Sequence, residues 1–238
     1  MFNVIILTAY PEMFPGSLKY SLIGKALNEK IFKIETINLH DFGIDNRKSI
    51  DDEPFGGGPG MILRPDVVEK ALLSIAIKQN LNSAKIYLTP SGALLSQGKL
   101  GILSKLDEII ILCGRFEGVD QRAIDILGFE EISIGDYVLA GGEIAAQVLL
   151  EGCIRLIPGV LGHPESLLEE SFSDNLLEYP HYTRPHVWED SLGKKHDVPE
   201  VLTSGHHGNI KKWRLNKSVE KTKKIRPDLY IKKEQKQD

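Results

Sequence analysis

Cysteine is scarce in this chain of 238 residues, which contains only Cys113 and Cys153. Two cysteines without the spacing of metal ligands argue against a disulfide framework and a cysteine-based zinc site, so we expect a reducing compartment, the cytoplasm. Long apolar runs are absent too, since none approaches the ~18 residues that a membrane-spanning helix needs. No basic segment precedes the apolar N-terminal stretch, which is therefore typical of a first strand rather than of a secretory signal.

The usual phosphate-binding loops are also missing. Four glycines and two prolines fall within Pro54–Gly60, but the stretch lacks both the Gly-Lys-Ser/Thr ending and the G-x-G-x-x-G spacing that hold nucleotide phosphates. The sequence therefore argues against a nucleotide hydrolase. The long segment His40–Gly60 is either a substrate clamp that includes Arg47 or a surface excursion.

Charge is distributed unevenly along the chain. The net charge is −4, yet residues 209–238 contain 11 Lys and Arg against four Asp and Glu, which leaves 18 against 29 for the preceding residues. This basic, helix-compatible segment contains Trp213 and Tyr230. It favours contact with nucleic acid, because Lys and Arg displace condensed counterions from phosphates. The alternative is a solvated helix face.

Apolar runs and helical stripes alternate along the first two thirds of the chain, which predicts an α/β fold with a parallel sheet. The patterns predict strands over Phe2–Thr8, Phe32–Leu39, Ala84–Leu88 and Glu108–Cys113, and helices over Leu18–Asn28, Asp66–Lys78 and Gln97–Leu106. After Leu161 the composition becomes irregular, with little strand character. Pro199–Asp238 is again helical by pattern, so we expect a second, mainly helical domain.

Three strand ends in succession open into loops that are rich in Gly, Pro and polar residues. These loops are Thr89–Gly92, Gly114–Gly118 and Gly135–Gly142. Ligands of open α/β sheets gather outside the carboxyl ends of the strands, so the three loops predict a binding site. The stretch Ile132–Glu143, where a Gly-Gly pair opens a helix, is expected to be its centre.

An arginine follows the helix that begins after this Gly-Gly pair. The predicted apolar side of the helix contains Ile144, Ala145, Val148, Leu149 and Leu156. At ~100° per residue, Arg155 points along that same side, toward the core. It is either one half of an i,i+4 pair with Glu151, worth ~0.2–0.5 kcal/mol, or a cation at the edge of a pocket.

Six motifs together carry a resemblance to a known family. They are YLTPSG (Tyr87–Gly92), LCGRFEGVDQR (Leu112–Arg122), SIGDYVLAGGE (Ser133–Glu143), RLIPGVLG (Arg155–Gly162), YPHYTRP (Tyr179–Pro185) and SGHHGNIKKWR (Ser204–Arg214). In this order they resemble the bacterial tRNA (guanine-N1)-methyltransferases, of the knotted (SPOUT) RNA methyltransferase superfamily. The resemblance implies methyl transfer from S-adenosyl-L-methionine to N1 of the guanosine immediately 3′ of the anticodon in tRNA.

The resemblance also implies an organisation of the chain. It implies a knotted α/β S-adenosylmethionine-binding domain over residues 1–162, with a deep trefoil knot, a flexible linker over 163–175 and a helical tRNA-binding domain over 176–238. It further implies a homodimer whose active site is shared between subunits, and a magnesium requirement, although no metal-ligand cluster stands out in the sequence.

Residue roles carry over by position. The cofactor loops of the family match Tyr87, Leu88, Thr89, Pro90, Gly92, Gly114, Arg115, Glu117, Gly118, Ser133, Ile134, Gly135, Asp136, Tyr137, Val138, Leu139, Gly141 and Gly142. Residues near the tRNA match His181, Tyr182, Arg184, His206, Lys211, Lys212 and Arg214. The catalytic arginine and the general-base carboxylate match Arg155 and Glu170.

Glu170 departs from the pattern of the family, which has Asp before Ser-Phe at this position. The chemistry needs a carboxylate here, because guanine N1 must lose its proton to become nucleophilic and an arginine would stabilise the charge that develops toward O6. Glu and Asp have similar ordinary pKa values, ~4.3 and ~3.9, so basicity is preserved. The extra methylene changes the reach of the carboxylate, and a displacement of about 1 Å can cost ~10²-fold in rate.

Two other functions stay open from the sequence. A knotted methyltransferase acting on another RNA position, such as a ribose hydroxyl, would bind the same cofactor without needing a carboxylate beside its target. A non-catalytic RNA-binding protein could retain a degenerate pocket, although the intact glycine loops argue against it.

Overall fold

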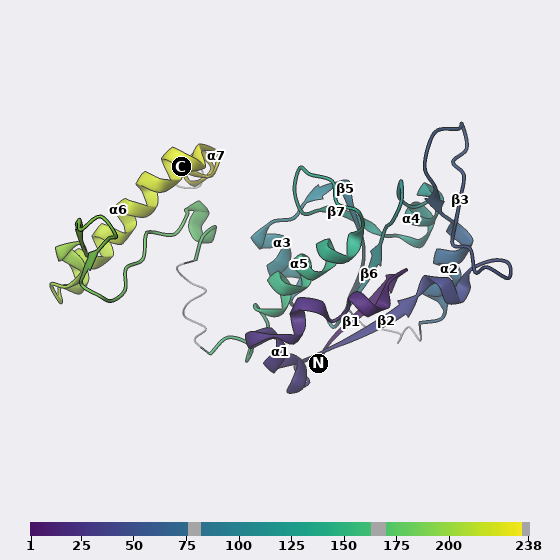
Figure 1. Ribbon diagram of the computed structural model, residues 1–238, viewed down its shortest axis with the longest axis horizontal. Coiled ribbons are helices and arrows are strands. Elements are labelled where there is room, and N and C mark those ends of the chain that lie inside the picture. Colours follow the sequence, from purple (N-terminus) through teal and green to yellow (C-terminus); the bar gives the residue numbers. More distant parts are fainter. Residues whose placement is uncertain (76–81, 163–169, 235–238) are drawn as a thin grey trace. The chain divides into compact units, whose positions relative to one another are not determined.

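The computed structural model describes residues 1–75, 82–162 and 170–234 (Figure 1). The chain divides into two compact units, Met1–Gly162 and His163–Asp238. Each unit is described by itself below. None of the helices in the described ranges combines the length and the apolar composition needed to cross a membrane.

The first unit is built on a five-stranded sheet in which every pairing is parallel. Its strands, in the spatial order β2-β1-β6-β5-β7, are β2 (Phe32–Asn38), β1 (Phe2–Thr8), β6 (Glu108–Cys113), β5 (Ser83–Leu94) and β7 (Glu130–Ser133). The central strand β6 reads EIIILC and is buried at every position, as expected for a strand covered on both faces. The predicted parallel α/β architecture is thereby confirmed.

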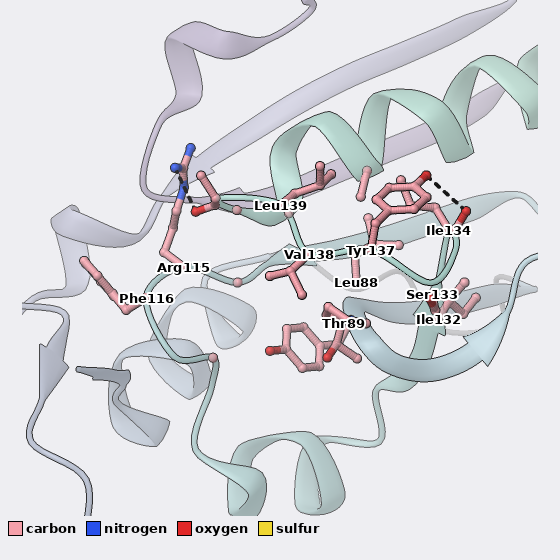
Figure 2. A pocket seen from close by; sticks show the side chains of 18 of the residues that line it. Leu88, Thr89, Arg115, Phe116, Ile132, Ser133, Ile134, Tyr137, Val138 and Leu139 are labelled. Atoms are coloured by element: carbon pink, nitrogen blue, oxygen red, sulfur yellow. Dashed lines mark hydrogen bonds between the residues drawn. The ribbon is translucent and has the colours of Figure 1, made fainter. Parts of the chain in front are cut away.

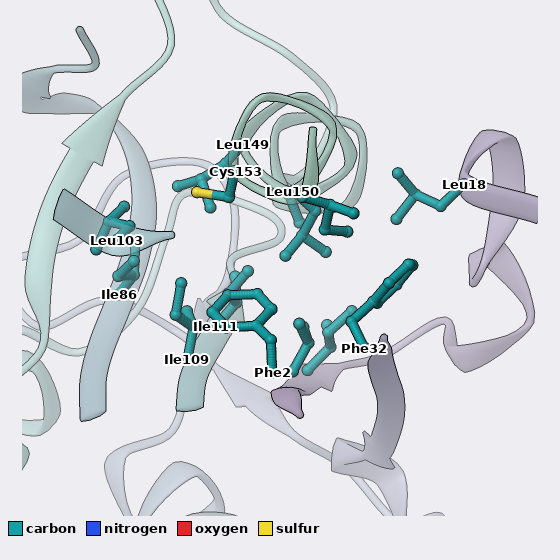
Figure 3. Close-up of a cluster of buried hydrophobic side chains, with 14 of the residues drawn as sticks. Phe2, Leu18, Phe32, Ile86, Leu103, Ile109, Ile111, Leu149, Leu150 and Cys153 are labelled. Carbon is teal, nitrogen blue, oxygen red and sulfur yellow. The ribbon is translucent and has the colours of Figure 1, made fainter. Parts of the chain in front are cut away.

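Helices cover both faces of this sheet (Figure 1). On one face lie α1 (Ser21–Asn28), α3 (Gln97–Leu103) and α5 (Gly142–Ile154), and on the other lie α2 (Pro65–Leu73) and α4 (Gln121–Leu127). Figure 3 shows the core beneath α5, where Leu149, Leu150 and Cys153 pack toward Ile109 and Ile111 of β6. The helices do not cover the carboxyl ends of β5, β6 and β7. A pocket lies at these strand ends.

Short elements complete the first unit. They are the antiparallel pair β3 (Asp51–Asp52) and β4 (Ile62–Leu63), which frames the Gly-rich loop, and 3₁₀ helices over Pro11–Met13, Gly16–Lys19 and Leu39–Phe42. The predicted helix over Leu18–Asn28 is therefore divided between a 3₁₀ turn and α1. The predicted helix over Asp66–Lys78 corresponds to α2, with residues 76–78 outside the described ranges.

Within residues 170–234, the second unit contains two α-helices and a small hairpin. The helices are α6 (His207–Ile225) and α7 (Pro227–Glu234), and the hairpin consists of β8 (Val187–Glu189) and β9 (Lys195–Asp197). Short 3₁₀ helices span Ser173–Asn175 and Glu200–Leu202. Pro227 separates α6 from α7, because proline is tolerated in the first turn of a helix but not in its interior.

The hairpin corrects the prediction of little strand character before Pro199. Its strands are three residues long and exposed at every position, so they lack the apolar alternation that identifies a half-buried strand. They are stabilised locally instead. Asp190 accepts hydrogen bonds from the backbone of Leu192 and Lys194, at 2.9 and 3.0 Å, and Gly193 takes a φ of +79° in the turn.

Candidate functional site

A pocket lies where the carboxyl ends of β5, β6 and β7 meet (Figure 2). It is lined by Tyr87, Leu88, Thr89, Pro90, Gly114, Arg115, Phe116, Glu117, Gly118, Ile132, Ser133, Ile134, Gly135, Tyr137, Val138, Leu139, Ala140, Gly141, Gly142 and Ala145. All three sequence-predicted loops contribute to this lining. Two residues of the predicted cofactor set, Gly92 and Asp136, are not part of it.

Gly92 lies instead in an irregular part of β5. Leu88 and Ala93 both have Ile132 of β7 as their partner in the parallel register, so residues 89–92 form a bulge. A Cβ atom on Gly92 would lie 2.4 Å from the backbone nitrogen of Ile132. Gly92 therefore permits the close passage of β5 over β7, and the bulge directs Thr89 and Pro90 toward the pocket. The predicted turn at Thr89–Gly92 is this bulge within a longer strand.

The segment after β6 forms the second wall. Tyr87 lies against it, since a Cβ atom on Gly114 would be 2.9 Å from the tyrosine ring. Burial raises the pKa of Tyr87 above its ordinary value, so its hydroxyl stays protonated at neutral pH. The backbone of this segment is tied to β4, because the N–H of Glu117 donates to the carbonyl of Met61 and that of Leu63 donates to Gly118, both at 2.9 Å.

The loop after β7 forms the third wall. Gly135 takes a φ of +150°, and its N–H donates to Ser133 Oγ at 3.2 Å. The Tyr137 hydroxyl donates to the carbonyl of Ile134 at 3.2 Å, which folds the ring back on the loop (Figure 2). Asp136 is exposed at the outer side of this turn. The loop is thus shaped by its own hydrogen bonds.

Main-chain donors remain available in the same loop. Across the described ranges of the chain, the amide nitrogens of Val138, Leu139, Ala140 and Gly141 donate no hydrogen bond to another residue. Val138 is 83% exposed although it is apolar. Unused donors beside exposed apolar side chains at a helix N-terminus suit a ligand that has both polar and apolar parts.

A buried ion pair that the sequence did not identify lies behind this loop. Arg115 Nη2 is 2.9 Å from Oε2 of Glu143, whose side chain is 1% exposed. The sequence places Glu143 in the first turn of a helix, where a carboxylate is common. Its burial is set by contacts with β1 and with the segment after β6, both distant in sequence, so no local signal could have predicted it.

The predicted catalytic residues belong to different units. Arg155 is half-buried and follows the last residue of α5, at the end of the helix opposite to Gly142. The predicted apolar side of the helix is only partly buried. Ala145 and Leu149 are 7% and 0% exposed, whereas Ile144 and Val148, whose spacing placed Arg155 on that side, are 50% and 48% exposed. Glu170 belongs to the second unit and is half-buried.

Aromatic and basic residues gather in the second unit around α6. The guanidinium of Arg214 lies 4.8 Å from the centre of the Tyr179 ring, and the rings of Tyr182 and Trp213 are 6.2 Å apart. His181 Nε2 is 2.8 Å from a carboxylate oxygen of Glu178. Four other residues predicted near tRNA are exposed: Arg184, His206, Lys211 and Lys212.

Comparisons with known proteins identify relatives over almost the whole chain. Residues 2–232 match the model of the family described as tRNA (Guanine-1)-methyltransferase TrmD. A protein named tRNA (guanine-N(1)-)-methyltransferase from Ehrlichia canis (strain Jake) is 48% identical over 228 residues, which cover 95% of this chain and 94% of the relative. Proteins of the same name from Rhodospirillum rubrum and from Wolbachia pipientis subsp. Culex pipiens are each 50% identical, over 96% of this chain and over 92% and 97% of their own lengths.

Proposed function

The chain belongs to the tRNA (guanine-1)-methyltransferase family, and from that premise we propose that it methylates N1 of the guanosine immediately 3′ of the anticodon in tRNA. The methyl donor is S-adenosyl-L-methionine, which supplies an electrophilic methyl group on a positively charged sulfur. We propose the pocket at the ends of β5, β6 and β7 as the donor site. The observation that carries this assignment is the convergence of three glycine-containing strand ends on one pocket.

The chemistry of the lining fits this donor. The unused amides of Val138–Gly141 match the acceptors of an adenine and a ribose, whereas Leu88, Ile132 and Ile134 supply apolar surface for a planar base. Gly142 brings the loop close to β6, since a Cβ atom there would lie 2.9 Å from Cys113 Cα. Main-chain recognition of this kind needs glycines and few charged side chains, which is what the lining contains.

We propose Glu170 as the general base and Arg155 as its electrostatic partner. The carboxylate of Glu170 would accept the proton of guanine N1, and the electron pair left on nitrogen would form the new N–CH₃ bond. The S–CH₃ bond of the donor would break at the same time, and its electron pair would stay on sulfur, which leaves as the neutral thioether of S-adenosylhomocysteine. Charge that develops toward O6 would be stabilised by the guanidinium of Arg155. The alternative of a ribose target needs no carboxylate, so variants at Glu170 separate the two reactions.

Helix α5 supports the proposal of a homodimer. Its 13 residues run from Gly142 at the pocket to Ile154, beside Arg155, a length of about 20 Å at ~1.5 Å per residue. Arg155 therefore cannot serve the pocket formed by the N-terminus of its own helix. A second copy of the chain would bring its own Arg155 to that pocket, and the exposed Ile144 and Val148 on α5 offer an apolar surface for the association.

We assign tRNA binding to the second unit. Lys211 and Lys212 are exposed on α6, and Arg184 and His206 are exposed in the same unit, so they are available to phosphates. Tyr182 is 48% exposed beside Trp213, and such rings stack on unpaired bases. We propose the domain limits expected from the resemblance, with 163–175 as linker and 176–238 as the tRNA-binding domain.

The remaining features of the resemblance form part of the same proposal. A trefoil knot in the first unit is part of this proposal, and it rests on membership of the family. We propose a cytoplasmic location and a magnesium requirement. No group of three or more His, Cys, Asp or Glu suited to a metal occurs within the described ranges. The magnesium requirement is therefore tested on activity, by measuring methylation after depletion with EDTA and again after Mg²⁺ is restored.

One experiment tests the reaction. The purified protein is incubated with methyl-labelled S-adenosyl-L-methionine and a tRNA that has guanosine 3′ of the anticodon, and the labelled nucleoside is then mapped. We expect 1-methylguanosine at that position and none in a tRNA with adenosine there. Label on a ribose would identify a different methyltransferase, and cofactor binding without any transfer would identify a non-catalytic RNA-binding protein.

A further inference from the structure

Glu143 is a fully buried carboxylate that the proposed chemistry does not use. The residue is 0% exposed, at the first turn of α5. Its Oε1 accepts hydrogen bonds from Thr8 Oγ1 at 2.8 Å and from Arg115 Nε at 3.2 Å. Its Oε2 lies 2.9 Å from Arg115 Nη2 and makes no hydrogen bond within the described residues, so that contact is an ion pair.

Arg115 extends this network to the wall of the pocket. Its Nη1 donates to the carbonyl of Ala140 at 3.3 Å (Figure 2). A Cβ atom on Gly141 would lie 2.4 Å from Arg115 Nε, so the guanidinium rests directly against the backbone of the loop after β7. Its other side lies 4.3 Å from the centre of the Tyr10 ring, and Nη2 is 3.4 Å from Met13 Sδ.

These contacts leave the guanidinium little freedom. The hydroxyl of Thr8 accepts a hydrogen bond from the Tyr10 N–H at 3.0 Å while it donates to Glu143. The end of β1, the segment after β6, the loop after β7 and the start of α5 are thus joined through two charged side chains. The amides of Val138–Gly141, which the proposed function assigns to the methyl donor, belong to the loop that this network holds.

Stability alone gives a weak reason for such a pair. Removing two charges from water is costly, and apolar residues of similar volume often replace a buried ion pair with no loss of stability. The hydrogen bond from Arg115 to the Ala140 carbonyl is not replaceable in this way, because an apolar side chain cannot donate a hydrogen bond. An apolar residue in place of Arg115 would therefore leave the Ala140 carbonyl without this donor.

We propose that Arg115 and Glu143 are positioning residues for the methyl-donor loop, an inference that rests on the proposed function. Glu143 fixes the orientation of the Arg115 guanidinium, and Arg115 fixes the carbonyl of Ala140, so that the neighbouring amides face the pocket. The guanidinium itself acts on the loop rather than on the donor. This role differs from that of Arg155, which the proposed reaction places beside the guanine.

A double variant separates positioning from stability. In Glu143→Gln we expect a lower thermal midpoint and weaker binding of S-adenosyl-L-methionine, because Arg115 loses its charged partner. In Arg115→Met/Glu143→Leu we expect the thermal midpoint to return toward that of the unaltered protein. The dissociation constant of the donor, measured by calorimetry, should remain at least about tenfold higher, since small displacements of binding groups carry large costs. The KM for tRNA should not change.

The control is Arg122→Met. Arg122 pairs with Asp120 at 2.6 Å, just after the same glycine segment, but its side chain is 65% exposed and it does not line the pocket. Its loss should leave donor binding unchanged. Thr8→Val removes the hydroxyl that donates to Glu143 and accepts from the Tyr10 N–H. It leaves both charged side chains in place, so it provides a milder variant in which a selective rise in the KM for the donor is expected.

The outcomes are distinct. Donor affinity that recovers together with the thermal midpoint in the double variant would overturn the positioning role, as would an unchanged KM for the donor in Thr8→Val. Failure of the unaltered protein to bind S-adenosyl-L-methionine would instead overturn the proposed function, and the positioning role with it.

Discussion

Glu170 is followed by a turn that fixes the direction of the backbone. The Phe172 N–H donates to the carbonyl of Leu176 at 2.7 Å, and the Glu178 N–H donates to Ser171 Oγ at 3.1 Å. Phe172 takes a φ of +76°, which is uncommon outside glycine. Because the backbone on this side of Glu170 is constrained, the length of its side chain determines how far the carboxylate reaches.

We expect Glu170→Gln to lower the single-turnover rate of methylation by ~10²–10⁴-fold, because the amide cannot accept the N1 proton. Glu170→Asp should keep the base but shorten its reach, which gives an intermediate rate, with losses up to ~10²-fold. Rapid-quench assays with labelled donor measure both rates. Donor binding should be unchanged, and Glu169→Gln serves as the control. A full rate in Glu170→Gln would remove Glu170 from the mechanism.

The two cysteines should be inert. Burial raises the pKa of Cys113 well above its ordinary value, with a further contribution from the negative charge of Glu143, and burial raises the pKa of Cys153 to about 12. Both therefore stay protonated at pH 8, and the thiolate is the reactive form. We expect no reaction with Ellman's reagent in the native protein and two thiols per chain in guanidinium. A fast native reaction at either cysteine would contradict this prediction.

At the level of elements, α5 has two apolar faces. Ala146, Leu149, Leu150 and Cys153 are buried against the sheet, while Ile144 and Val148 remain about half exposed. Globular helices usually have one apolar stripe and a polar opposite face. The second stripe explains why the sequence grouped Ile144 and Val148 with the buried residues of α5, since apolar periodicity cannot distinguish a core from an association surface.

We expect Val148→Asp to convert the proposed dimer into a monomer, because a carboxylate in an apolar interface would lose its hydration without gaining a partner. Light scattering after size-exclusion chromatography measures the mass. Methylation should fall with the dimer, since Arg155 would no longer reach a pocket. The matched control is Leu73→Asp, at an apolar residue of α2 that is 71% exposed. A monomeric unaltered protein, or a dimeric Val148→Asp, would contradict the proposal.

Elements whose own residues follow a clear pattern could be predicted, whereas features that depend on which distant residues come together could not. The apolar runs of β1 and β6 were identified with their observed bounds, because strands covered on both faces are mostly apolar. The extension of β5 to Leu94 depends on β7, some forty residues later. The same holds for Glu143, whose role follows from Thr8 and Arg115. Sequence motifs located the pocket loops, but not the ion pair behind them.

At the level of the whole molecule, an excess of basic charge is confined to residues 209–238, at the end of the second unit. Lys211 and Lys212 are exposed on α6, so they are free to meet phosphates. Arg214 is half-buried and lies over the Tyr179 ring. Its substitution would disturb packing as well as charge, and the two lysines therefore give a cleaner measurement of the electrostatic contribution.

We expect Lys211→Gln/Lys212→Gln to weaken tRNA binding and to reduce the slope of log K against log salt by about 0.7–0.9 for each phosphate contact that is lost. Filter binding across a range of KCl concentrations measures the slope. Lys25→Gln/Lys33→Gln removes the same charge from exposed positions in the first unit and should leave the slope unchanged. Equal slopes in both double variants would indicate that the basic face of α6 is only solvated.

All five strands of the sheet run in the same direction, so the carboxyl ends of the strands lie on one side of the first unit and the amino ends on the opposite side. The pocket residues lie at the carboxyl ends of the strands, whereas the described residues at the amino ends include short connections such as Ser104–Asp107, which leads into β6. Mutations can therefore change the two sides independently. Substitutions at the amino ends of the strands can adapt the stability of the enzyme to another growth temperature, while the carboxyl ends keep the pocket geometry that the chemistry requires.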